Sequence, residues 1–151
     1  MPGKQDWETP PELFDKLHPI FNFTLDAAAT AINRKCSRFY SPEDNAFNQT
    51  PSGESIWLNP PYYDVLPWAK LVNKWAKSNS IVLLVQDRTD TEWFRTIFYS
   101  AEAIRFLYPR VNFVGTETGN SRGSAIFIFG TGELYEYRVD LWNWTSEPCP
   151  V

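Results

Sequence analysis

The tetrapeptide Asn59-Pro60-Pro61-Tyr62 directly follows the apolar segment 56–58. The side-chain oxygen of Asn59 and the backbone carbonyl of Pro60 can each accept a hydrogen bond from an exocyclic amino group such as adenine N6. That nitrogen is a poor nucleophile, and two acceptors would hold it and offset the positive charge that develops as it attacks. The prolines fix the backbone φ and add no competing donor. Tyr62 could stack on a base extruded from a duplex, although Asn beside prolines also suits an ordinary turn.

The elements around this tetrapeptide alternate between amphipathic helices and short apolar strands. We expect helices over 10–17, 66–78 and 91–100, with Thr9 and Asp90 as N-caps, a helical turn over 27–32, and strands over 21–25, 56–58, 81–86, 103–108 and 125–129. This alternation predicts an α/β fold with a mostly parallel sheet in three layers. Asp26, Asn59 and residues 86–88 each follow a predicted strand, and ligands bind at the carboxyl ends of strands in such sheets.

Composition limits the architecture and the partners. The chain has 151 residues, of which 43% are hydrophobic, and no linker or repeat divides it. We expect a single domain over 1–151, with a core over about 6–130 and a C-terminal extension over 131–151. The formal net charge of −4 provides no global basic field, so DNA binding would require cations clustered locally. The alternating aromatic and polar residues of the tail predict an extra strand and either a packed or a dimer-forming extension.

The cysteines and the single histidine point away from metal chemistry. Cys36 and Cys149 lie far apart in the chain and form neither a disulfide framework nor a metal-ligand spacing. His18 has no second histidine to join it as a ligand, so we expect no metal. No apolar run is long enough to cross a membrane, and the first residues form no apolar targeting segment. These observations predict a cytoplasmic protein.

Several ordered segments resemble one protein family. They are WETPPELFDKL, FTLDAAAT, EDNAF and LNPPY, followed by RTDTEWF and RVNF. Over roughly residues 6–130 the chain resembles the Dam-like DNA N6-adenine methyltransferases that bacteriophages often encode. The resemblance implies a Rossmann-like methyltransferase fold, S-adenosylmethionine as cofactor, double-stranded DNA as substrate, and the host cell cytoplasm as location. Each segment alone is weak evidence for the family, whereas four segments in the right order, at predicted strand ends and helix starts, are specific evidence.

The resemblance also implies which residues bind the cofactor: Trp7, Thr9, Pro10, Asp26, Ala27, Asp44 and Asn45. The N-terminal element would lie over the methionine end, and Asp44 would meet the adenine amino group. Asp26 would bind the cofactor after the first strand. Asp26 could also merely cap the following turn, and Thr9 could be only a helix cap.

Two features depart from the pattern of this family. Ala27-Ala28-Ala29 stands in place of the glycine-rich loop that is usual in methyltransferases, which leaves space for a cofactor but less backbone freedom. Only 18 residues separate Asp26 from Asp44, which is too few for a complete helix-and-strand repeat. We therefore expect a fold reduced in size, in which Glu43 or another group holds the ribose hydroxyls.

Arginines in the last two-thirds of the chain are candidate DNA contacts. We predict that Arg88, Arg110, Asn112 and Arg122 bind DNA, and we expect Arg105 near the same loops. Arg88 could instead pair with its acidic neighbours, and Arg110 could be an ordinary solvated residue. The polar segment 115–124 could be a plain hairpin or a loop that enters a groove of DNA.

The sequence thus predicts a site-specific, S-adenosylmethionine-dependent DNA adenine N6-methyltransferase. Two alternatives remain open. The tetrapeptide also suits methylation of another amine or amide, such as an RNA base or a protein glutamine, and the compressed cofactor region is compatible with a non-catalytic DNA-binding protein of the same fold. Because 151 residues leave no room for a separate target-recognition domain, either the 115–124 loop recognises the target, or a second subunit helps in a homodimer, or specificity is slight.

Overall fold

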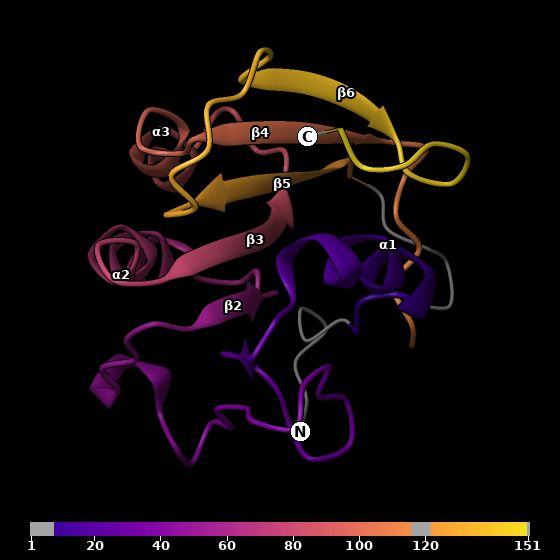
Figure 1. The fold of residues 1–151 in the computed structure, drawn as a ribbon. Helices are drawn as coiled ribbons and strands as arrows, with labels where there is room; N and C mark the ends of the chain where they lie inside the picture. The colour runs from indigo at the N-terminus through magenta and orange to yellow at the C-terminus, as the bar shows by residue number, and fades with distance from the viewer. Residues whose placement is uncertain (1–7, 116–121, 151) are drawn as a thin grey trace.

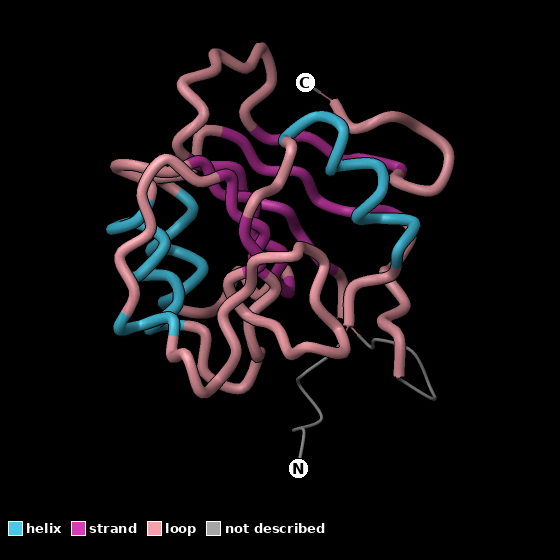
Figure 2. The backbone as a smooth tube through the Cα atoms, turned by 60° about the horizontal axis from the view of Figure 1, so that its bottom comes forward, coloured by secondary structure: helices cyan, strands magenta, loops and turns pink. Residues whose placement is uncertain are grey.

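The computed structural model describes residues 8–115 and 122–150. The described residues form a six-stranded sheet in the order β1-β2-β3-β5-β4-β6. The strands are β1 (Leu25–Asp26), β2 (Ser55–Leu58), β3 (Ser80–Gln86), β4 (Ala103–Tyr108), β5 (Ser124–Phe129) and β6 (Val139–Asn143). The helices are α1 (Pro11–Phe21), α2 (Leu66–Trp75), α3 (Glu92–Phe98) and the short 3-10 helix η1 (Ala46–Asn48). Figures 1 and 2 show α1 on one face of the sheet and α2 with α3 on the other, which confirms the predicted three-layer α/β fold.

The sheet is mixed but mostly parallel. β5 runs antiparallel to both of its neighbours, β3 and β4, whereas the other pairs are parallel. The carboxyl ends of β1, β2, β3 and β4 therefore lie at the same edge of the sheet as the amino end of β5. We call this edge the C-terminal edge. It is where a ligand is expected in an open α/β sheet.

Aromatic side chains attach the helices to the two faces of the sheet. Phe14 of α1 meets Trp57 of β2 edge-on, with ring centroids 5.5 Å apart. On the other face, Phe94 of α3 meets Phe127 of β5 at 5.2 Å, again edge-on. The central strand β5 is buried throughout, as expected for a strand with a helix layer on each side.

Helix α1 begins and ends differently from the prediction. Its N-cap is Pro10, which makes no side-chain cap hydrogen bond, so the predicted capping role of Thr9 is wrong. The helix continues through Pro19 to Phe21, and Asn22 ends it in the left-handed conformation at φ 50°. The predicted strand over 21–25 is correspondingly reduced to Leu25 and Asp26, because the residues before it complete the helix and its cap.

The predicted helical turn over 27–32 is also wrong. Residues 27–40 form a loop of bends with one turn at 31–33. The end of this loop runs beside β1: the Asp26 N–H donates to the Arg38 carbonyl at 3.1 Å, and the Tyr40 N–H donates to the Asp26 carbonyl at 2.9 Å. This short segment protects the exposed side of β1, so the expected reduction of the repeat between Asp26 and Asp44 is confirmed.

The remaining elements follow the prediction closely, with one shifted cap. Helix α3 is capped by the Thr91 hydroxyl, which accepts from the Phe94 N–H at 3.3 Å, rather than by Asp90. None of the described helices is both long and apolar enough to cross a lipid bilayer.

The C-terminal extension packs onto the sheet through its own strand. β6 pairs in parallel with β4, which confirms the predicted extra strand. Arg105 of β4 is buried and donates hydrogen bonds to the carbonyls of Tyr137 at 3.0 Å and Pro150 at 3.3 Å. The expectation that Arg105 lies near the loops that carry Arg88, Arg110 and Arg122 is therefore wrong, because its guanidinium is buried and holds the tail of the chain.

Candidate active site

A cavity of about 870 Å³ lies beside the carboxyl ends of β1 and β2. Its walls come from the N-terminal segment, the loop after β1, the segment around η1, the residues after β2, the first turn of α2, and Val114 with Gly115. Segments far apart in sequence therefore converge on one space at the C-terminal edge. Of the predicted catalytic and cofactor-binding residues, six line it: Thr9, Asp26, Ala27, Asn45, Asn59 and Pro61.

The amide of Asn59 is held at both of its atoms. Its Nδ2 donates to the Thr9 hydroxyl at 3.1 Å, and its Oδ1 accepts from the Tyr62 hydroxyl at 2.7 Å. The Tyr62 hydroxyl also lies 3.3 Å from the carbonyl oxygen of Leu84 in β3. In this arrangement Oδ1 faces the Tyr62 hydroxyl and Nδ2 faces the Thr9 hydroxyl. An amide oxygen carries two lone pairs, so Oδ1 can accept a further hydrogen bond from a substrate amine.

The rest of the tetrapeptide is rigid and largely covered. Pro60 is buried, and Tyr62 is 9% exposed, with its ring meeting Phe113 edge-on at 6.0 Å. Burial raises the pKa of Tyr62 far above its usual value, so the hydroxyl stays protonated and remains a donor. The next residue, Tyr63, is 75% exposed and lines the cavity. The stacking role of Tyr62 stays a prediction, and Tyr63 is a second aromatic ring at the site that the sequence reasoning did not single out.

Asp26 organises the loop after β1 and also faces the cavity. Its Oδ2 accepts from the Lys35 N–H at 2.9 Å and its Oδ1 accepts from the Ala28 N–H at 3.3 Å. Burial raises its pKa to about 6, while these hydrogen bonds and the charge of Lys35 act in the opposite direction. The carboxylate thus caps its own loop, and the capping and cavity-lining interpretations both hold for this residue.

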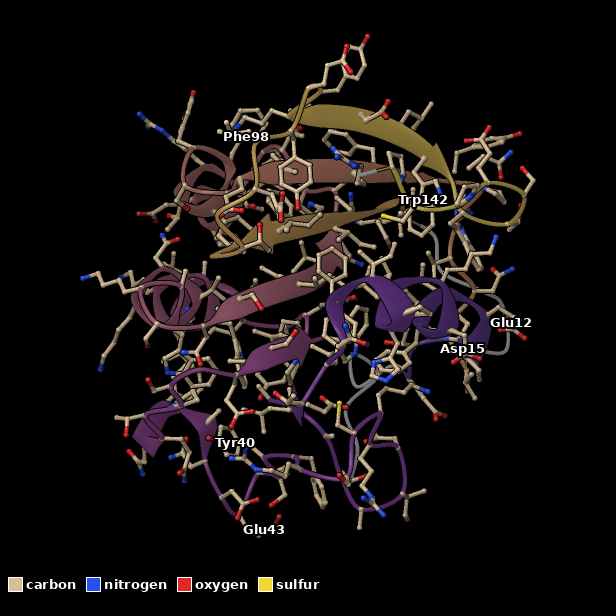
Figure 3. The ribbon with its side chains drawn as sticks, in the orientation of Figure 1. Glu12, Asp15, Tyr40, Glu43, Phe98 and Trp142 are labelled. Atoms are coloured by element: carbon tan, nitrogen blue, oxygen red, sulfur yellow. The ribbon has the colours of Figure 1, made fainter. Side chains whose placement is uncertain are left out.

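The segment 41–47 brings Asn45, rather than Asp44, to the cavity wall. The Asp44 carboxylate accepts from the N–H and hydroxyl of Ser41 at 2.9 and 3.0 Å, and these bonds lower its pKa. Asn45 has a positive φ of 54° and caps η1 by accepting from the Phe47 N–H. Figure 3 shows Glu43 at the outer end of this segment, away from the sheet.

Two aromatic rings in contact with each other contribute to the apolar part of the cavity wall. Phe47 and Trp68 both line it, and their ring centroids lie 4.7 Å apart. The charged part comes from Glu8, Asp26 and Lys35. The sequence reasoning missed Phe47, Trp68, Glu8 and Lys35 as site residues. The available signal was weak: Phe47 is an aromatic residue within an otherwise polar stretch, and Glu8 lies within the WETPP segment.

The predicted DNA-binding residues all lie in loops at the C-terminal edge. Arg88 follows β3, Arg110 and Asn112 follow β4, and Arg122 precedes β5. Arg110, Asn112 and Arg122 are exposed, whereas the Arg88 guanidinium donates to both carboxylate oxygens of Asp90 at 3.0 and 3.2 Å. The Asp87 N–H donates to the Gly123 carbonyl at 3.1 Å, which joins the loop after β3 to the start of β5.

Trp7 and most of the 115–124 loop are outside the described residues. Within the described part of the chain, no group of three or more His, Cys, Asp or Glu side chains is placed to hold a metal ion.

Comparison with known proteins assigns the family. Residues 2–133 match the family model described as DNA N-6-adenine-methyltransferase (Dam). The chain is 31% identical over 121 residues to a DNA N-6-adenine-methyltransferase of Haemophilus phage HP1, covering 77% of this chain and 70% of that protein. It is 30% identical over 170 residues to a DNA N-6-adenine-methyltransferase of Escherichia phage T1, covering 95% of this chain and 70% of that protein. The chain therefore belongs to the Dam family of DNA N6-adenine methyltransferases.

Proposed function

We propose that this protein transfers the methyl group of S-adenosylmethionine to the N6 amino group of adenine in double-stranded DNA, at a specific site, with Asn59 at the reacting centre. The observation that carries the proposal is the Asn59 amide, which two hydroxyl groups orient at the wall of a large cavity. The two phage proteins with which the chain aligns are both named DNA N-6-adenine-methyltransferase.

The cavity has the chemistry that this cofactor requires. Among the described residues its charged lining consists of two carboxylates, Glu8 and Asp26, and one ammonium, Lys35, and these three carry a net charge of −1 when Asp26 is ionised. S-adenosylmethionine carries a sulfonium, an ammonium and a carboxylate, and the two net charges are therefore complementary. Phe47 and Trp68 offer an aromatic surface for the adenine ring, and Asn45 offers a polar side chain beside it. When bound, the cofactor supplies an electrophilic methyl group.

Residues of the tetrapeptide hold the target nitrogen. An adenine rotated out of the duplex places its amino group where Asn59 Oδ1 and the Pro60 carbonyl each accept one N–H. Both acceptors are dipoles already oriented before the reaction, so they offset the charge on the attacking nitrogen with little reorganisation. Proximity and alignment then carry the in-line displacement. The proton leaves N6 after attack, so the residue that activates the amine need not be a titratable base.

DNA would lie across the C-terminal edge of the sheet. Arg110 and Arg122 are exposed there and can contact phosphates, and Asn112 between them can contact a base or a phosphate. Arg88 is held by Asp90, which makes it the weaker candidate. We assign site recognition to the 115–124 loop, and we propose that the whole chain acts as one domain in the cytoplasm of a host cell. A homodimer would pair two copies through β6, which lies at the end of the sheet.

The direct test is the transfer of labelled methyl from S-adenosylmethionine to unmethylated DNA, with the product nucleoside identified by mass spectrometry. We expect N6-methyladenine from the native protein and a loss in kcat of about 10²- to 10³-fold or more in Asn59→Ala. Asn48→Ala is the matched control, because Asn48 is exposed and follows the cavity-lining residues 45–47. If DNA stays unmethylated and the label is found on RNA or on a protein glutamine, that molecule is the substrate in place of DNA. Failure to bind the cofactor would favour the non-catalytic alternative.

A further inference from the structure

The side chain of Lys35 is buried against the cavity with few partners. It is 12% exposed, and its Nζ lies 3.4 Å from Glu8 Oε1. Among the residues that the structure describes, Glu8 is its one hydrogen-bond acceptor. An ammonium group has three N–H donors. The contact with Glu8 is long, so the described part of the chain leaves most of the donor capacity of this cation for a further acceptor.

Burial of such a charge is expensive for a protein. An ammonium moved out of water must be paired and hydrogen-bonded, and a single long ion pair does not offset the lost hydration. A more exposed lysine or an apolar residue would stabilise this wall better. The position is therefore suited to binding a ligand anion that completes the hydrogen bonds of the ammonium.

The backbone around the pair is fixed from both sides. The Lys35 N–H donates to Asp26 Oδ2 at 2.9 Å, so the buried carboxylate after β1 sets the position of this residue. The Val114 N–H donates to the Glu8 carbonyl at 3.0 Å, which anchors the N-terminal segment. Both residues line the cavity, and the neighbour of Glu8, Thr9, bonds the Asn59 amide. The pair thus lies next to the proposed reacting centre.

We propose that Lys35 and Glu8 form the subsite for the amino-acid end of the cofactor. The Lys35 ammonium would bind the α-carboxylate, and the Glu8 carboxylate would bind the α-ammonium, so that the ion pair between them opens to receive a zwitterion. Asp26 acts here as a positioning residue, because it holds Lys35 through the backbone. This inference rests on the proposed use of S-adenosylmethionine, and it names the residues that bind the amino-acid end of that cofactor.

Three ligands distinguish this subsite from a structural ion pair. S-adenosylmethionine has both charged groups of the amino acid, decarboxylated S-adenosylmethionine keeps the ammonium alone, and 5′-methylthioadenosine has neither. Titration calorimetry would measure the affinity of each for the native protein and for Lys35→Met and Glu8→Gln. Native binding of S-adenosylmethionine tests the proposed function separately from the subsite.

Each variant has its own expected pattern. Lys35→Met should weaken S-adenosylmethionine by about 10- to 100-fold, as expected for a lost hydrogen bond to a charged group, and should leave the decarboxylated ligand unchanged or bound more tightly. Glu8→Gln should weaken both ammonium-bearing ligands and leave 5′-methylthioadenosine unchanged. Equal weakening of all three ligands in either variant would overturn the proposal, since it would show that the pair only supports the wall. Circular dichroism melting would establish that each variant is folded at the assay temperature.

Discussion

Removal of the Tyr62 hydroxyl tests the orientation of the Asn59 amide while the carboxamide itself is kept. Tyr62→Phe keeps the ring and its contact with Phe113, but it deletes the donor that lies 2.7 Å from Asn59 Oδ1. The Thr9 contact at 3.1 Å remains. In the structure the Tyr62 hydroxyl donates and the Thr9 hydroxyl accepts, so loss of the Tyr62 donor removes one of the two contacts that hold the amide in this orientation.

The expected magnitude follows from the value of one neutral hydrogen bond. Such a bond contributes about 0.5–1.5 kcal/mol net, which favours the correct orientation of the amide by about two- to tenfold. Without it the two orientations become comparably populated, so kcat should fall by up to about twofold. Because the carboxamide itself is retained, the loss should be far smaller than in Asn59→Ala. The affinity for S-adenosylmethionine should not change, since the hydroxyl is directed at the amide and at Leu84 rather than at the cofactor groups.

Single-turnover methylation of a short DNA duplex, together with calorimetric cofactor binding, provides the assay. Tyr99→Phe is a suitable control, because Tyr99 is 77% exposed and caps the C-terminal end of α3, away from the cavity. A native kcat in Tyr62→Phe would refute the orienting role of the hydroxyl. A raised KM for DNA with an unchanged kcat would instead assign Tyr62 to base binding, the role that its place in the tetrapeptide predicts.

Three further changes test the cavity, the fold and the DNA surface. Burial raises the pKa of Asp26 to about 6, so protonation below that pH should remove a charge that attracts the cofactor. Calorimetry should then show the affinity for S-adenosylmethionine falling by up to about tenfold per pH unit below pH 6, and unchanged above it. Gly130→Ala would place a Cβ against the backbone carbonyl oxygen of Asn79 at φ +69°. It should lower the melting temperature by several degrees more than Gly53→Ala, where φ is +71° and no atom lies within 4 Å of the added Cβ. Arg110→Ala should weaken DNA binding and reduce the slope of log affinity against log salt by about one, and Arg88→Ala should do less because Arg88 is paired; an equal effect of the two in binding assays at several salt concentrations would contradict this.

The central strands were readable from the sequence because burial on both faces leaves little choice of residue. The run IVLLVQ coincides with β3 apart from one residue at its start, and β4 matches residues 103–108 throughout. The direction of β5 was not readable, because a fully apolar strand reads the same whether its neighbours run parallel or antiparallel to it. Local signals failed where two adjacent residues could do the same task, as Asp90 and Thr91 could both cap α3.

The site was predictable where a residue lies at the carboxyl end of a predicted strand. Asn59 directly follows β2 and Asp26 is the last residue of β1, and both reach the cavity. Thr9 was placed in the correct segment for the wrong local reason, since its partner is 50 residues away in the chain. Lys35 and Glu8 could not be paired from sequence, because the loop of bends after β1 brings them together and no periodic pattern encodes that loop.

The antiparallel direction of β5 has a consequence for how this enzyme family can diversify. β4 runs toward the C-terminal edge and β5 runs away from it, so residues 109–123 leave and rejoin the sheet on the same side. The hydrogen bonds from Val114 to Glu8 and from Asp87 to Gly123 anchor the two described ends. A segment of another length or sequence can replace the intervening residues without shifting strand register, since loop closure costs change slowly with length. Under the proposed function, in which this connection recognises the target, it is a natural grafting position at which target preference can be exchanged between homologues while Asn59 is retained.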